Sequence, residues 1–376
     1  MLTIPFNRPS VGKRELDYIG ECLAGGKHSG DGPFTKRCNE AFRTLGLGNI
    51  LLTTSCTDAL EMAAILLGIG PGDEVILPSF TFVSSANAFA LRGATLRFAD
   101  SEIGNPNIAP DAIEALITPR TKAIVVVHYA GVACDMDRIE EIAKRHGIAI
   151  VEDAAQAIDS YHRGRPLGTI GAIGTMSFHE TKNISAGEGG LIMIRDEALY
   201  HRAEIVREKG TNRSAFFRGE VDKYGWVDLG SSFLPSDILA AYLLAQVERL
   251  PEIQGRRCAI WNRYDQALSS KLSAYGVRTA VLPEWATNNA HMFYLLFENL
   301  QQRQRVIDGL RASGITAASH YISLHSSPFF HQFHDGRPLP NSDRFTDTIL
   351  RLPMFADLAD DDVDLISDRV LELLEK

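Results

Sequence analysis

Short apolar runs alternate with amphipathic stretches between about Leu51 and Arg195. This pattern predicts strands at Glu74–Leu77, Thr95–Ala99, Ala123–His128, Ile148–Glu152, Ile173–Phe178 and Leu191–Ile194, and helices at Thr57–Leu67 and Asp135–His146. Such alternation is typical of an α/β fold with a mainly parallel sheet and helices on both faces. Ligands of these sheets bind beyond the carboxyl ends of the strands, so we expect chemistry in the residues that follow each strand.

After the predicted strands, helical periodicity predicts helices at Glu197–Lys209, Ser236–Leu250 and Gly255–Tyr275. A smaller α+β lobe follows, with a predicted strand at His291–Glu298 and predicted helices at Gln302–Ser313 and Asp361–Leu374. The least regular stretch is expected at Ser326–Ser342. We therefore predict a large α/β domain over residues 1–250 and a small α+β domain over residues 251–376.

Charge and cysteine usage narrow the class of protein. The formal net charge of −9 is spread over 376 residues without basic blocks, which disfavours nucleic acid and acidic membrane surfaces as partners. The five cysteines are odd in number and widely spaced, which argues against a disulfide framework or a zinc site and favours the cytoplasm. The amino-terminal residues lack the apolar core of a signal peptide, and no run approaches membrane-spanning length. We therefore expect a protein that acts on small molecules.

The segment Thr53–Ala63, TTSCTDALEMA, leads from a β-like start into a helix. Free N–H groups around Cys56, Thr57 and Asp58 then point at one spot, and the helix dipole favours an anion there. A phosphate suits that spot. The competing interpretation is a well-capped helix without a ligand, which on this segment alone is the commoner case.

The segment Ala149–Ala157, AIVEDAAQA, ends an apolar strand with two acids and an amide. Strand alternation sends Glu152 and Asp153 to opposite sides. Asp153 and Gln156 share a face if a helical turn follows, and a carboxylate there can hold a protonated ring nitrogen. The alternative is that Asp153 only caps a helix.

The segment His179–Gly190, HETKNISAGEGG, places one lysine, Lys182, five residues after the hydroxyl of Ser177 and before a run of glycines. Glycines let a backbone approach a ligand closely. A pyridoxal phosphate site needs a lysine amine, an anion cradle, an acid and an apolar wall. Phe80 or Phe82 in PSFTF offers that wall, although a core aromatic is the competing interpretation.

These segments occur in one order along the chain, and with them the sequence resembles the nucleotide-sugar aminotransferases of the DegT/StrS type. The resemblance rests on IPFNRP, GDGPFTKRC, TTSCTDALEMAA, GDEVILPSFTFVSSANAFALRGA, VHYAGVACDMD, VEDAAQ, SFHETKN, REKGTNRSAFFRG, VDKYGW, NAHMFY and HYISLH. It implies a fold type I enzyme that depends on pyridoxal 5'-phosphate. No G-x-G-x-x-G opens a helix near the start of the chain, which disfavours a dinucleotide-dependent oxidoreductase.

The resemblance also implies roles for single residues. Lys182 matches the lysine that binds the cofactor covalently, and Asp153 matches the partner of the pyridine nitrogen. The remaining cofactor contacts that it implies are Cys56, Thr57 and Asp58 at the phosphate, Phe82 and Gln156 at the ring, and Ser177.

One position departs from the family pattern. Many relatives supply an asparagine from a partner subunit to the phosphate, where this chain reads GSSFLPSD with Leu234. Ser231 or Ser232 is a candidate replacement. For the substrate, the resemblance suggests Lys209, Arg213 and Arg218 at a diphosphate and His325 at a sugar; a solvated helix end and loop histidines are the competing interpretations. No common metal spacing occurs among the histidines, so no metal is expected.

The reaction implied by the resemblance is transfer of an amino group from L-glutamate to C4 of dTDP-4-keto-6-deoxy-D-glucose, in a homodimer with shared active sites. Two alternatives stay open. One is C3 amination of a related keto-sugar nucleotide, and the other is a non-enzymatic regulator that binds pyridoxal phosphate. The intact lysine, acid and glutamine favour an enzyme over the regulator.

Overall fold

The computed structural model describes residues 3–375 of the chain. Its central sheet has seven strands in the order β1-β9-β8-β5-β4-β2-β3. The strands are β1 (Ile50–Thr53), β2 (Glu74–Pro78), β3 (Thr95–Ala99), β4 (Thr121–Val127), β5 (Ala149–Asp153), β8 (Ile173–Ser177) and β9 (Gly190–Ile194). Five neighbours, β8-β5-β4-β2-β3, are parallel, whereas β9 runs antiparallel to both β8 and β1. The expected mainly parallel sheet is confirmed, with β9 as the exception.

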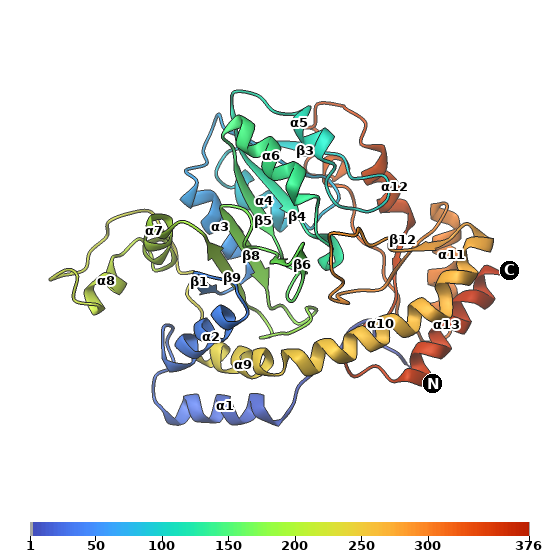
Figure 1. The fold of residues 1–376 in the computed structure, drawn as a ribbon, viewed down its shortest axis with the longest axis horizontal. Helices are drawn as coiled ribbons and strands as arrows, with labels where there is room; N and C mark the ends of the chain where they lie inside the picture. Colours follow the sequence, from blue (N-terminus) through green and yellow to red (C-terminus); the bar gives the residue numbers. More distant parts are fainter. Residues whose placement is uncertain (1–2, 376) are drawn as a thin grey trace.

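Helices cover both faces of this sheet (Figure 1). One apolar cluster includes α1 (Lys13–Ala24), α2 (Pro33–Thr44), α5 (Pro110–Glu114), α6 (Met136–His146) and α9 (Asp237–Glu248). The cluster on the other face includes α3 (Cys56–Leu66), α4 (Ser84–Ala90) and α7 (Glu197–Arg207). The strands are buried on both sides, which explains why they appear in the sequence as continuous apolar runs.

Helix α6 shows how the sequence encodes these elements. Met136, Ile139 and Ile142 are buried at helical spacing, and charged residues occupy the opposite face. Asp135 begins the helix because its side chain accepts the Arg138 N–H at 3.3 Å. Gly147 ends it with a φ of 65°, a left-handed conformation that glycine adopts at little cost.

A second, smaller sheet lies toward the carboxyl terminus. It has the antiparallel order β10-β11-β12, formed by β10 (Arg278–Thr279), β11 (Tyr294–Leu296) and β12 (Ile349–Arg351). Its core contains residues of α10 (Leu250–Leu272), α11 (Leu300–Ala312) and α13 (Asp360–Leu374), together with Ile4, whose strand segment pairs with Ile315. A further helix, α12 (Pro340–Thr348), precedes β12. The hairpin of β6 (Tyr161–His162) and β7 (Arg165–Pro166) forms a separate two-stranded sheet.

Helix α10 runs along the underside of the molecule in Figure 1 and joins the two lobes. Its first residues, Leu250 and Ile253, belong to the core of the large sheet, whereas Ile260 and Leu268 belong to that of the small one. The predicted division at residue 250 coincides with its start; the two domain ranges stay a prediction. At the left of Figure 1, α8 (Arg213–Phe217) and the loops on either side of it form an arm that extends from α7, away from the main body.

Most predicted elements are present, with shifted ends. The predicted strand at His291–Glu298 is three residues long, and the long helix begins at Leu250 rather than Gly255. The stretch expected to be least regular, Ser326–Ser342, is irregular until α12 begins at Pro340. No helix within residues 3–375 is both long and apolar enough to cross a bilayer.

Candidate active site

A cavity of about 680 Å³ lies where the small lobe meets the carboxyl edge of the large sheet. The residues that follow β4, β5 and β8 line one side of it, as expected for a parallel sheet. Residues of the carboxyl-terminal lobe, among them His320, Tyr321 and Arg351, line another side. Residues 3–375 contain no cluster of three His, Cys, Asp or Glu side chains placed to hold a metal ion, and all five cysteines are free.

The first turn of α3 forms one wall of the cavity. Ser55 caps the helix by accepting the Asp58 N–H at 3.1 Å, which leaves the N–H groups of Cys56 and Thr57 outside the helix's own hydrogen bonds. A Cβ atom on Gly190 would lie 2.4 Å from the Cys56 nitrogen, so only glycine permits β9 to pass so close to this turn. The result is a narrow, electropositive cradle for an anion.

Asp153 points into the cavity from the end of β5. Its carboxylate accepts the Ser85 hydroxyl at 2.7 Å and the Ala155 N–H at 3.1 Å, and the residue is buried. Glu152 points to the other side of the sheet, as strand alternation predicted. There it accepts the N–H groups of Gly168, Ile170 and Gly171 at 2.6–2.8 Å and is 3.0 Å from His128.

Lys182 lies in the loop between β8 and β9. The base of that loop is closed by the Phe178 N–H, which donates to the Gly189 carbonyl at 2.8 Å. Asn183 fixes the loop to α10, because its side-chain amide donates to Gln254 at 2.8 Å. Burial lowers the pKa of the Lys182 amine, although Cys56 and Asp153 nearby act in the opposite direction. Lys182 makes no ion pair with any carboxylate in the described chain, so its amine is available to a ligand.

Gln156 connects three parts of the wall. Its Oε1 accepts the Ala130 N–H at 2.6 Å, and its Nε2 donates to the Tyr321 hydroxyl at 3.2 Å. Ala130 has a φ of 58°, a left-handed conformation that costs energy in a residue other than glycine and that surrounding contacts have to maintain. The amide of Gln156 therefore has a fixed orientation at the cavity wall.

Aromatic rings close the remaining side. Phe82 lines the cavity with 55% of its surface exposed, and its ring lies 6.2 Å from that of Tyr321. His320 and Tyr321 are stacked with their ring centroids 3.8 Å apart. Phe80 is buried in the core beside Tyr321, so of the two phenylalanines considered as a wall only Phe82 lines the cavity.

Most of the residues expected at the cofactor lie together. The cavity is lined by Cys56, Thr57, Phe82, Asp153, Gln156, Ser177 and Lys182. Asp58 lies one residue further along α3, where its carboxylate accepts the Thr54 hydroxyl. The roles of these residues stay predictions, whereas their common location is a property of the fold.

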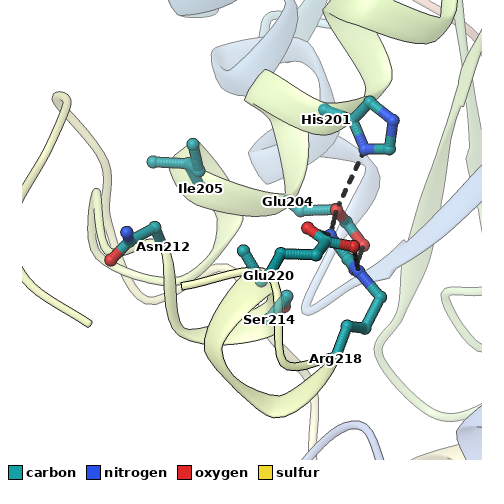
Figure 2. Close-up of a pocket in the computed structure, with 8 residues that line it drawn as sticks. His201, Glu204, Ile205, Asn212, Ser214, Arg218 and Glu220 are labelled. Carbon is teal, nitrogen blue, oxygen red and sulfur yellow. Dashed lines mark hydrogen bonds and ion pairs between the residues drawn. The ribbon is translucent and has the colours of Figure 1, made fainter. Parts of the chain in front are cut away.

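The four residues suggested for the substrate lie outside the cavity. Arg213 is 2.7 Å from Glu208, and Arg218 is held between Glu204 at 2.8 Å and Glu220 at 2.6 Å (Figure 2). Lys209 follows α7 with a φ of 65°. His325 is 2.7 Å from the Ser79 hydroxyl and 3.5 Å from Asp343. Within one chain, none of them faces the cradle.

Sequence reasoning missed His291, His320, Tyr321 and Arg351, which all line the cavity. The segment HYISLH was noted, but its second histidine, His325, was chosen over His320 and Tyr321. Burial lowers the pKa of His320 and raises that of Tyr321 to about 12. Both side chains are therefore neutral at pH 7.

Comparison with known proteins identifies the family. Residues 9–371 match the DegT/DnrJ/EryC1/StrS aminotransferase family. The chain belongs to this family. Its structure is similar to that of the aminotransferase TlmJ from Streptoalloteichus hindustanus, with 32% identity, a TM-score of 0.91, and 100% of this chain and 99% of that chain covered. It is also similar to S. venezuelae DesV, with 30% identity, a TM-score of 0.89 and all of both chains covered.

A third similar structure is the PMP-form of a putative sugar aminotransferase, Spr1654 from Streptococcus pneumoniae, with 28% identity, a TM-score of 0.90 and 99% of each chain covered. Together these likenesses confirm the expected fold type I architecture and the cofactor, pyridoxal 5'-phosphate. The chain is an aminotransferase that depends on this cofactor.

The cavity fits that cofactor. The cradle at the first turn of α3, where Ser55, Cys56 and Thr57 line the cavity, suits the phosphate group. Lys182 offers an unpaired amine, and Asp153 offers a buried carboxylate that can accept a hydrogen bond from the pyridine nitrogen. Phe82 and Gln156 border the space between these groups.

Proposed function

We propose that this aminotransferase moves the amino group of L-glutamate to C4 of dTDP-4-keto-6-deoxy-D-glucose, giving a dTDP-4-amino-4,6-dideoxyhexose and 2-oxoglutarate. The observation that carries the proposal is the unpaired amine of Lys182 opposite the carboxylate of Asp153 in one cavity. The choice of substrate rests on the resemblance of the motifs, from IPFNRP to HYISLH, to those of dTDP-4-amino-4,6-dideoxygalactose transaminase. Similarity to Spr1654, a putative sugar aminotransferase, supports a sugar substrate.

The residues around the cavity explain how the reaction would proceed. Pyridoxal phosphate supplies an electron sink for the carbon that loses its proton. Lys182 moves that proton, and burial favours the neutral amine that can accept it. The carboxylate of Asp153 would accept a hydrogen bond from the protonated pyridine nitrogen and so stabilise the positive charge there. The stacked rings of His320 and Tyr321 line this space and would limit the access of water to it.

A homodimer with shared active sites is part of the proposal. The arm around α8 exposes large apolar side chains, with Trp226 80% and Phe217 70% exposed, and such a surface favours contact with another protein. Lys209, Arg213 and Arg218 lie in or beside this arm, so they could meet a sugar diphosphate only in the cavity of a second copy. Light scattering should give twice the mass of one chain; a monomer would exclude shared sites.

The free cysteines favour a reducing compartment, and we propose the cytoplasm as the location of the enzyme.

Two other functions would use the same cavity. Amination at C3 of a related sugar differs only in how the sugar is seated, and a regulator would bind the cofactor without turnover.

One incubation separates these functions. The enzyme is mixed with pyridoxal phosphate, L-glutamate and the dTDP-4-keto sugar, and the product is analysed by proton NMR. We expect an amine at C4, and the coupling of the C4 proton reports its configuration. A parallel incubation contains a dTDP-3-keto sugar instead; amination of that sugar at C3, with none of the 4-keto sugar, would overturn the proposed position. A bound cofactor whose spectrum glutamate leaves unchanged would support the regulator.

A further inference from the structure

Arg351 is a half-buried cation without a counter-charge in the wall of the cavity. It ends β12 and lines the cavity together with Lys182, His320 and Tyr321. No carboxylate in residues 3–375 lies within ion-pair distance of its guanidinium. The carboxylates on the cavity wall are engaged elsewhere, Asp153 by Ser85 and Glu188 beside His179 at 3.7 Å.

The guanidinium is held in place but not satisfied. Its plane lies over the ring of Phe6, 4.5 Å from the ring centroid, and Nη2 donates to the Ser319 carbonyl at 3.3 Å. The buried Nε has no hydrogen-bond acceptor in the described chain. Buried donors without acceptors are costly, and at Arg351 a ligand that enters the cavity can supply the missing acceptor.

The surroundings favour an anion at this position. Burial lowers the pKa of Arg351, which means that its charge is poorly solvated. The same charge contributes to the lowered pKa of both Lys182 and His320. An anion beside Arg351 would relieve this uncompensated charge, and a carboxylate matches the fork of a guanidinium in two parallel hydrogen bonds.

We propose that Arg351 binds the carboxylate of the amino donor that lies next to the reacting amine. In an amino acid this carboxylate is attached to the carbon that bears the amine, so it must lie close to Lys182. The diphosphate of a sugar nucleotide is separated from a C4 amine by the pyranose ring and therefore lies further away. The inference rests on the proposed function, because it takes an amino acid as the donor.

Two variants test the assignment. Arg351→Gln removes the charge, and Arg351→Lys keeps it but loses the fork. The matched control is Arg278→Gln, since Arg278 lies exposed in the same small sheet and away from the cavity. Far-UV circular dichroism and thermal unfolding establish that each variant is folded and binds the cofactor. If Arg351→Gln does not fold, the wild-type enzyme is compared with Arg351→Lys instead.

The first measurement is binding of glutarate, a dicarboxylate without an amine, to the cofactor-loaded enzyme by calorimetry. We expect Kd to rise by about 10- to 100-fold in Arg351→Gln, by less in Arg351→Lys, and not in Arg278→Gln. The second is binding of dTDP, which carries the diphosphate without the sugar. We expect no change for dTDP. Loss of dTDP binding with unchanged glutarate binding would overturn the proposal and assign Arg351 to the nucleotide.

The third measurement separates this proposal from the proposed function. The change in the cofactor spectrum on addition of L-glutamate follows the first half of the reaction and needs no sugar. We expect Arg351→Gln to need about 10- to 100-fold more glutamate for half the maximal rate. If the wild-type enzyme does not respond to glutamate, the proposed donor is wrong. If wild type and Arg351→Gln respond alike, the assignment of Arg351 is wrong.

Discussion

Two arginines, Arg351 in the cavity and Arg218 on the arm, carry the same charge in opposite settings. Arg351 has no carboxylate partner in the described chain and lines a wall with neutral aromatic rings. Arg218 sits between Glu204 and Glu220, which together carry twice its charge (Figure 2). An added anion would relieve an excess of positive charge at Arg351, whereas at Arg218 it would have to compete with two carboxylates.

The comparison shows that the charged neighbours of an arginine determine whether it is available to bind an anion. The sequence around Arg218 contains acids that the fold brings back onto it, with Glu204 from α7 and Glu220 just after α8. The sequence around Arg351, ILRLPMF, contains no acid. An arginine within an apolar run is therefore a better candidate for an anion site than one in a mixed-charge segment, because burial prevents water from satisfying it.

The largest effect is expected at Lys182, the other cation of the cavity. Lys182→Ala removes both the amine that binds the cofactor and the group that moves the proton, so we expect turnover to fall by at least about 10⁴-fold. The absorbance of lysine-bound cofactor should also disappear. Lys122→Ala is the control, since Lys122 is exposed on β4 and lies away from the cavity. Normal turnover in Lys182→Ala would contradict the assignment of the site.

Asp153 balances the charge of the cavity and should show the next largest effect. Asp153→Asn keeps the shape of the side chain but removes the negative charge that holds a proton on the pyridine nitrogen. We expect kcat to fall by about 10²- to 10³-fold, with the cofactor still bound to Lys182. The control is Asp159→Asn, the same exchange outside the cavity at a position with a φ of 56° that asparagine tolerates. Equal kcat values for the two variants would exclude this role.

The large sheet could be predicted because each strand is a separate apolar run between turn residues. The six predicted strands match β2, β3, β4, β5, β8 and β9 to within two residues at each end. Four short strands, β6, β7, β10 and β12, were missed because two or three residues are too few to show an alternation of period two. The whole of α12 was missed, because Pro340 is typical of a loop unless it lies in the first turn of a helix.

The residues of the candidate site also fall into two groups, those that the sequence predicted and those that it did not. Asp153 and Ser177 end two parallel strands and Lys182 lies in the loop after the second, so the parallel topology places them at one edge of the sheet. Tyr321 and Arg351 reach the cavity through the packing of a separate lobe, more than 130 residues along the chain from Lys182. No local pattern encodes that packing. Hence the cofactor side of the cavity was predicted and the side opposite it was not.

The smallest effect is expected at Arg218. In Arg218→Gln the carboxylates of Glu204 and Glu220 lose a common partner, and such exposed pairs contribute less than about 1 kcal/mol to stability. Because these carboxylates compete with any diphosphate for Arg218, we expect KM for the dTDP-sugar to rise by no more than about threefold. The glutamate half-reaction, which Arg351→Gln impairs, should be unchanged. A rise in KM of tenfold or more would mean that the carboxylate cluster opens in the working enzyme, and that Arg218 then contributes to substrate binding as strongly as the unpaired Arg351.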